Sequence, residues 1–180
     1  MRRLLITGLS GAAVVLAIVT LAMHAEPEAS IDRPKLSGGA TSVGALLDEL
    51  LEAVAANDEN ALHRLRVTET EYRSIIVPGT VSAGAPPRQA SEQITTFFWS
   101  MLDTKSRDYG RLTLRQFGGQ HLQRRGVEYR NGIKRFGGYT AYGSVHLTVV
   151  TDEGTQTELR SGTIAEVDGR YKLIGLNWDD

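Results

Sequence analysis

The sequence contains no cysteine among its 180 residues, and its charge is almost balanced, with 20 Lys and Arg against 21 Asp and Glu. The lack of thiols excludes disulfide frameworks, thiolate zinc sites, cysteine nucleophiles and a lipidated N-terminal cysteine. The net charge of -1 at pH 7 argues against nucleic acid as a partner. Hydrophobic residues make up 41% of the chain and charged residues 23%, which is typical of a globular protein.

The N-terminus has the pattern of a targeting segment. Arg2 and Arg3 precede an uncharged, largely apolar run over residues 4–23. Arginines before such a run place the N-terminus in the cytoplasm and the rest of the chain outside. The run is long enough to span a bilayer as a retained signal anchor, and a signal peptide cleaved after Ala25 is the alternative. Either way we expect an extracytoplasmic protein, periplasmic or secreted, with membrane association if the segment is retained.

The remaining residues divide into a linker and one domain. Residues 26–41 contain two prolines and two adjacent glycines without apolar periodicity, so we expect a flexible linker. Apolar residues from Val43 to Val54 recur at helical spacing, which predicts a helix capped by Thr41 or Ser42. We therefore assign residues 1–25 to the signal peptide or anchor, 26–41 to the linker and 42–180 to the domain.

Three further helices are predicted from their N-caps. Asp58 caps a short helix, and Thr68 with the acid at position 71 has the spacing of a capping box, opening a helix that ends before Pro78. Ser91 caps a longer helix. We expect the core-facing side of this helix to be formed by Ile94, Phe97, Phe98, Met101 and Leu102, with Trp99 at its flank.

From His121 onward the apolar period becomes 2, which predicts antiparallel strands joined by short turns. The turns are the Asn-Gly pair at 131–132, a three-residue loop at 152–154 and the Asp-Gly pair at 168–169. They predict these strand partners: Glu128 with Arg135, Val127 with Phe136, Val149 with Thr157, Leu147 with Leu159, Val145 with Ser161, Leu159 with Trp178, Ser161 with Leu176, and Thr163 with Ile174.

This register separates two faces of the sheet. We expect the outer face to carry His146 beside Arg160, with the histidine facing solvent. We expect the inner face to collect Tyr139, Ala141, Gly143, Val145, Leu147, Val149, Thr157, Leu159, Ser161, Thr163, Ala165, Ile174, Leu176 and Trp178.

Helices followed by a strand meander predict an α+β fold, with N-terminal helices packed in a curved, cone-like antiparallel sheet. This order, the segment AANDENALHRL between the first two helices and the closing GTIAEVDGRYKLIGLNW hairpin resemble the nuclear transport factor 2-like superfamily with its cystatin-like fold, over about residues 42–180. The resemblance implies a pocket between sheet and helices, and a homodimer formed through the outer sheet face. No catalytic motif of an enzyme branch matches residue by residue.

The residues give little support for catalysis. The expected inner face has no Asp, Glu or His, and general acid–base catalysis needs such a group within reach of substrate. Asp103, Glu71 and His63 are the remaining candidates on helices, and we expect each of them to be solvated. The histidines lack metal-ligand spacing, so we expect no catalytic residue, no metal and no cofactor.

We therefore expect a non-catalytic, small-molecule-binding or assembly domain; the alternative is an isomerase or cyclase acting on a hydrophobic small molecule with a helix-borne base. Excess positive charge over residues 105–135 could meet anionic lipid or a wall polymer, or balance acidic neighbours over 48–71. The expected contacts of an apolar ligand are Trp99, Tyr139, Ser161, Thr163 and Trp178. The expected homodimer contacts are Tyr142, Ile164, Tyr171 and Leu173.

Overall fold

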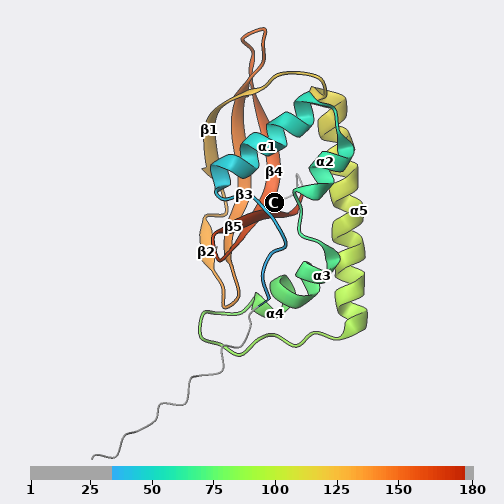
Figure 1. The fold of residues 1–180 in the computed structure, drawn as a ribbon, viewed down its shortest axis with the longest axis vertical. Helices are drawn as coiled ribbons and strands as arrows, with labels where there is room; N and C mark the ends of the chain where they lie inside the picture. The colour runs from blue at the N-terminus through green and yellow to red at the C-terminus, as the bar shows by residue number, and fades with distance from the viewer. Residues whose placement is uncertain (1–33, 177–180) are drawn as a thin grey trace, which may run out of the picture. The chain divides into compact units, whose positions relative to one another are not determined.

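A computed structural model describes residues 34–176, and it confirms the α+β class: helices come first and a five-stranded antiparallel sheet follows (Figure 1). The predicted targeting segment and Trp178 lie outside these residues. Within the described range, no helix is long and apolar enough to cross a membrane. The elements are α1 (Val43–Ala55), α2 (Glu59–Arg64), α3 (Glu69–Glu71), the π-helical turn η1 (Tyr72–Ile76), α4 (Val77–Gly79), α5 (Glu92–Phe117), β1 (Gln123–Tyr129), β2 (Ile133–Arg135), β3 (Thr140–Val150), β4 (Gln156–Val167) and β5 (Arg170–Gly175).

The predicted helix starts are confirmed by hydrogen bonds. Ser42 Oγ accepts from the backbone N–H of Ala45 at 3.0 Å, and Asp58 Oδ1 accepts from that of Ala61 at 3.0 Å. Each cap satisfies an N–H group that the first turn of a helix leaves without a partner. Helix α1 then buries its predicted apolar stripe against the sheet.

The third predicted helix has the capping box but does not stop before Pro78. It continues through the π-helical turn η1 into α4, and Pro78 lies inside α4. The backbone N–H of Val77 bonds to the carbonyl of Tyr72, five residues earlier. In a regular α-helix the ring of Pro78 would clash with the carbonyl group four residues earlier. The wider π-helical turn avoids this spacing, so the helix can continue to Pro78.

The predicted linker 26–41 is wrong over its last residues. Leu36 and Ala40 are buried in the core, and Ala40 forms an antiparallel bridge with Tyr171 of β5. The backbone N–H of Ser37 donates to a carboxylate oxygen of Glu71 at 2.6 Å. The folded domain therefore begins before residue 42, because this segment packs against β5 and the core.

The sheet has the strand order β1-β3-β4-β5, with β2 also paired to β3. The pairs Leu147 with Leu159 and Val149 with Thr157 are as predicted. The predicted hairpin across residues 131–132 is wrong. Val127 and Glu128 pair with β3, at Leu147 and His146, and β2 continues along the same edge of β3. The Asn-Gly pair therefore connects β1 to β2, which both pair with β3.

Three register shifts account for the other differences: one on each side of Val145 in the β3–β4 pair, and one between Thr163 and Ile164 in the β4–β5 pair. Val145 pairs with Gly162 instead of Ser161, next to Ser144 with φ of 49°. Farther along β4, Thr163 pairs with Gly175 instead of Ile174. A bulge adds one residue to one strand, so every later side chain on that strand changes face.

The change of face divides the predicted inner set between two core clusters. Ile164 and Leu173 lie in the cluster under α1, whereas their chain neighbours Ala165 and Ile174 pack with the other cluster, which includes Tyr139 and contacts η1. Neighbouring residues of a strand point to opposite faces, so this end of the sheet is covered on both sides. The prediction of one inner and one outer face is wrong here.

Helix α5 is oriented differently from the prediction. Four of the five residues that we expected in the core are exposed: Ile94 is 52% accessible, Phe97 64%, Phe98 47% and Met101 42%. The fifth, Leu102, is half-buried and lies against Gly175 of β5. Small and polar residues face inward instead, among them Ser106, which is fully buried. The end of β5 comes so close that a Cβ on Gly175 would lie 2.9 Å from Ser106 Oγ. Gly175 has no side chain, which permits this approach to Leu102 and Ser106 of α5.

Candidate functional site

The predicted ligand contacts do not converge on one pocket. Tyr139 is buried, and its hydroxyl hydrogen-bonds Thr80 at 2.9 Å. Trp99 packs against the same cluster. Ser161 lies on the other side of the sheet, two residues from Leu159 and with the same parity, and Thr163 is only half-buried. The sheet therefore separates Ser161 from Tyr139 and Trp99, so these residues do not line one pocket.

The predicted homodimer contacts are not on a free outer face. Ile164 and Leu173 are fully buried in the core under α1. Tyr142 stacks on Tyr129 and on Tyr171, with ring centroids 5.4 Å and 6.1 Å apart, and these rings pack against the same core. Ile164 and Leu173 therefore cannot contribute to a dimer contact in this fold, whereas Tyr142 and Tyr171 remain partly exposed.

The three helix residues named as possible bases are all engaged in ion pairs or hydrogen bonds. Asp103 accepts from Arg66 Nη1 at 2.9 Å and from Arg107 Nε at 2.8 Å. Nε2 of His63 lies 3.4 Å from the carboxylate of Glu59. Burial lowers the pKa of His63, and hydrogen bonds from the two arginines outweigh burial to lower that of Asp103.

Glu71, expected in solvent, is buried instead and forms an ion pair with Lys172 of β5. Lys172 Nζ lies 2.9 Å and 3.0 Å from the two carboxylate oxygens, and both side chains are 6% exposed. The backbone N–H groups of Ser37 and Thr68 also donate to the carboxylate, at 2.6 Å and 2.7 Å. Burial raises the pKa of Glu71, but the hydrogen bonds outweigh it and the pKa is lowered. The pair joins three segments of the chain: the one at Ser37, the start of α3 and β5.

Arg66 is a further buried charged residue, and it pairs with Asp103 of α5. Its side chain is 3% exposed, and its guanidinium carbon lies 5.8 Å from the centre of the Trp99 ring. Trp99 in turn packs on Tyr72, with ring centroids 5.4 Å apart. Burial lowers the pKa of Arg66, although Asp103 opposes this shift. Sequence reasoning missed Arg66, because its charge alone gave no sign of burial.

His146 is opposite Arg160, as predicted, but it does not face solvent: it is 4% exposed. Its ring nitrogens lie 3.1 Å from Ser144 Oγ and 3.1 Å from a carboxylate oxygen of Glu158. By strand alternation it points away from the core side of Leu147. His146 is therefore buried beneath the polar side chains of the outer face rather than in the core.

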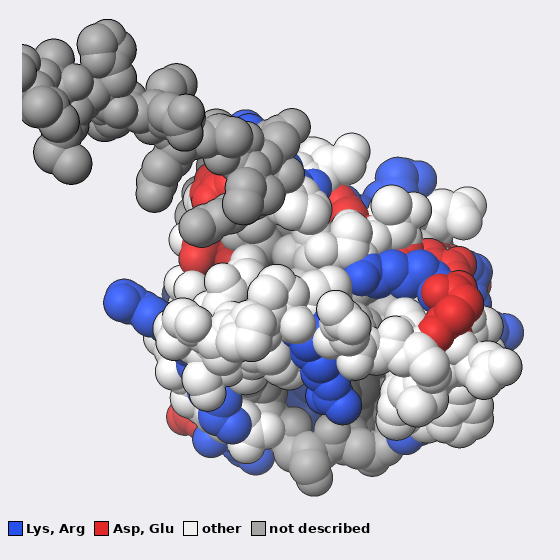
Figure 2. Space-filling model, turned by 90° about the horizontal axis from the view of Figure 1, so that it is seen from below, with Lys and Arg blue, Asp and Glu red and all other residues white. Residues whose placement is uncertain are grey.

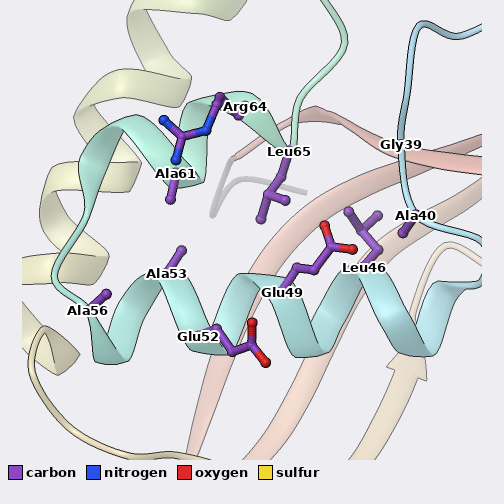
Figure 3. A pocket seen from close by; sticks show the side chains of 10 residues that line it. All are labelled: Gly39, Ala40, Leu46, Glu49, Glu52, Ala53, Ala56, Ala61, Arg64 and Leu65. Atoms are coloured by element: carbon purple, nitrogen blue, oxygen red, sulfur yellow. The ribbon is translucent and has the colours of Figure 1, made fainter.

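A groove of about 450 Å³ lies between α1 and α2 (Figure 3). Figure 3 shows that Glu49 and Glu52 of α1 and Arg64 of α2 lie around it, with small and apolar side chains between them. Glu49, Glu52 and Arg64 are exposed side chains. The groove therefore lacks the buried, convergent polar groups that orient a ligand in a specific site.

Charges on the surface are interspersed. Figure 2, viewed from the end of the domain with α3 and α4, shows Lys and Arg among Asp and Glu rather than in one patch. From the positive region 105–135, Arg111 lies 3.7 Å from Glu59 and Arg124 lies 2.7 Å from Asp48. The basic residues therefore balance acidic helices in at least these two places. This supports the expectation that the positive region pairs with acidic neighbours over 48–71, and not the alternative of anionic lipid or a wall polymer.

Comparison with protein-family models, with curated proteins and with solved structures gave no match for this chain. Over residues 34–176, no group of three or more acidic or histidine side chains is arranged to hold a metal ion. The sites that stand out physically are therefore the buried cation Arg66 and the exposed apolar stripe on α5 formed by Ile94, Phe97, Phe98 and Met101.

Proposed function

We propose that this protein is an extracytoplasmic assembly domain that forms homodimers through the α5 stripe, which comprises Ile94, Phe97, Phe98 and Met101. Its N-terminal segment exports the chain and, where retained, anchors it. The observation that carries the proposal is the exposure of these four apolar side chains on successive turns of one helix. Apolar residues grouped on a surface mark contact sites, and aromatic residues and Met are enriched in the centres of interfaces.

The spacing of the stripe supports a second copy of the chain as the partner. A two-fold interface brings the same surface together twice, so it must complement itself. In an antiparallel pair of α5 helices with the axis between Phe97 and Phe98, Ile94 faces Met101 of the second copy. Every position of the stripe then meets another apolar position of the stripe.

The residues that follow the stripe favour a protein over a lipid surface. Lys105 and Asp108 continue the exposed side of α5 with opposite charges. Helices that lie on anionic bilayers carry mainly Lys and Arg around their apolar side. We therefore retain the dimer predicted from the sequence but place it on α5. The resemblance to the nuclear transport factor 2-like superfamily remains a prediction beside this proposal.

Cross-linking tests the antiparallel pairing directly, because the natural chain has no cysteine. We expect Ile94→Cys chains mixed with Met101→Cys chains to form a mixed disulfide dimer on mild oxidation. Gln116→Cys is the control. It is exposed and lies eighteen residues after Phe98, five turns along the same side of α5 and roughly 27 Å away. It should form no disulfide-linked dimer on oxidation if the helices are antiparallel.

Sedimentation of the full chain in detergent tests the contribution of the stripe. We expect the double substitution Phe97→Glu with Phe98→Glu to convert a dimer into a monomer. Leu112→Glu introduces one acidic side chain at an exposed apolar residue of α5 outside the stripe and should leave the dimer intact. A wild-type chain that sediments as a monomer at every concentration contradicts the proposal, as does a dimer that survives the double substitution.

A further inference from the structure

One edge of the sheet has no neighbouring strand beside β1 and β2. Figure 1 shows these strands on the side of the domain opposite α5. The edge at β5 is covered, because the segments before α1 and after α2 bridge to Tyr171 and Leu173. Among residues 34–176, β1 and β2 pair only with β3, and the one bridge on this edge joins Phe136, just after β2, to Ser82. The edge of β2 itself is therefore open.

The open edge of β2 presents backbone hydrogen-bonding groups at alternate residues. The carbonyl of Gly132 and the N–H of Phe136 both bond to the β3 side, at 2.9 Å each. Every second residue of an antiparallel strand exchanges hydrogen bonds with a given neighbour. The N–H and C=O groups of Lys134 therefore point toward β3, whereas those of Ile133 and Arg135 point away from it.

The chain itself shows what this outward row of groups binds. The N–H of Gly137, the next residue in the row, donates to the carbonyl of Val81 at 2.8 Å. Val81 and Ser82 thus begin an added antiparallel strand at this edge. The chain then turns away, and the N–H of Ala85 donates back to the carbonyl of Ser82 at 2.9 Å. The outward groups of Ile133 have no strand partner in the described part of the chain, and extended peptides add to sheet edges through such groups.

The charged side chains of β2 are cationic and have no acidic partner. Lys134 and Arg135 are both exposed, and neither forms an ion pair within residues 34–176. Glu128 of β1 lies 3.8 Å from another arginine. Glu166, in the same cross-strand row as Arg135, accepts from a turn N–H at 2.8 Å. Opposite charges on neighbouring strands stabilise their pairing, so this edge favours a partner strand that contains Asp or Glu.

We propose that β2 binds an extended acidic peptide, which adds to the sheet as a strand and places an apolar side chain beside Ile133. Ile133 is 55% exposed, so it offers an apolar contact between the cations and β1. A second copy of the same edge is disfavoured, because an antiparallel pair of β2 strands would bring the Lys134 and Arg135 side chains of both copies together. The site is separate from the dimer proposed on α5 and does not depend on it.

Amide hydrogen exchange, followed by NMR on the ¹⁵N-labelled full chain in detergent, tests strand addition. The probe is the capped peptide Thr-Val-Glu-Glu-Val-Thr-Val, and its control is the same peptide with Lys in place of both Glu residues. We expect the acidic peptide to shift the backbone N–H signal of Ile133 with saturation and to slow its exchange. Lys134 should gain no protection, since its N–H already points toward β3. The lysine peptide should have no effect.

Two sets of variants separate the contributions of backbone and charge. Ile133→Pro removes the outward N–H and should abolish binding, while the fold is retained because proline is tolerated where the N–H of an edge strand faces solvent. Ile133→Ala keeps that N–H and should still bind. Lys134→Gln with Arg135→Gln should weaken binding at least tenfold. Arg115→Gln with Arg170→Gln removes two exposed cations elsewhere and should leave binding unchanged.

The proposal is overturned if neither peptide moves the Ile133 signal, or if the lysine peptide acts as well as the acidic one. It is also overturned if the acidic peptide shifts signals without slowing exchange at Ile133, which would indicate attraction between charges alone. Binding by Ile133→Pro as tight as that of the wild type would have the same consequence. Sedimentation measures the α5 dimer separately, so the two proposals can fail independently.

Discussion

The buried pair of Glu71 and Lys172 predicts an unequal response to removal of either partner. In Glu71→Gln, the amide has one acceptor oxygen for the N–H groups of Ser37 and Thr68, and its NH₂ group meets the Lys172 ammonium. Lys172 then keeps its charge at 5% exposure without its carboxylate. Leaving a buried charge without its partner costs about 3–5 kcal/mol of the free energy of unfolding.

Lys172→Met should cost less. The carboxylate of Glu71 keeps two backbone N–H donors, at 2.6 Å and 2.7 Å, and the methionine fills most of the space of the lysine stem. We expect a loss of about 1–3 kcal/mol, the usual range for a buried group that loses one of its partners. The double variant should lose less free energy of unfolding than the two single variants lose together, by roughly 0.5–3 kcal/mol.

Urea unfolding of the full chain, followed by tryptophan fluorescence, measures these differences. The same experiment has a pH dependence. The folded-state pKa of Glu71 is lowered, so its contribution is present above its unfolded pKa of about 4.3 and is lost as the pH falls through the folded value. Glu71→Gln should remove that part of the acid sensitivity. A Lys172→Met variant as unstable as Glu71→Gln, or strictly additive effects, would refute the reasoning.

Two further predictions concern the backbone. A Cβ on Gly138 would lie 2.7 Å from the Cα of Gly79, so Gly138→Ala should lower the free energy of unfolding, measured by urea titration, by about 1–3 kcal/mol. Gly126→Ala is the control and should have little effect, because its Cβ would lie at an ordinary contact distance of 3.6 Å from Thr148. Asp168 has φ of 49° in the turn between β4 and β5, so Asp168→Ala should cost about 1–2 kcal/mol. Asn tolerates this region, so equal losses for Asp168→Asn and Asp168→Ala would contradict the explanation.

The candidate sites were only partly predictable. Trp99 was named as a ligand contact, and it does lie beside the buried cation, but Arg66 itself was not recognised. Its burial follows from the segment after α2 that bridges to Leu173 of β5, a contact between residues more than one hundred positions apart in the chain. The stripe on α5 was recognised as a unit and assigned to the wrong environment, because a helical apolar pattern is the same whether it faces a core or a partner.

The sequence by itself determined the features that depend on bonds between near neighbours. Ser42, Asp58 and Thr68 cap helices because each side chain reaches an N–H three residues ahead, and the Asp-Gly pair at 168–169 makes its turn for a similarly local reason. Only the tertiary structure decided which side of α5 is covered and where strands change face. A single bulge, such as the one at Ser144, reverses the alternation for the rest of a strand, and its position depends on pairing with distant residues.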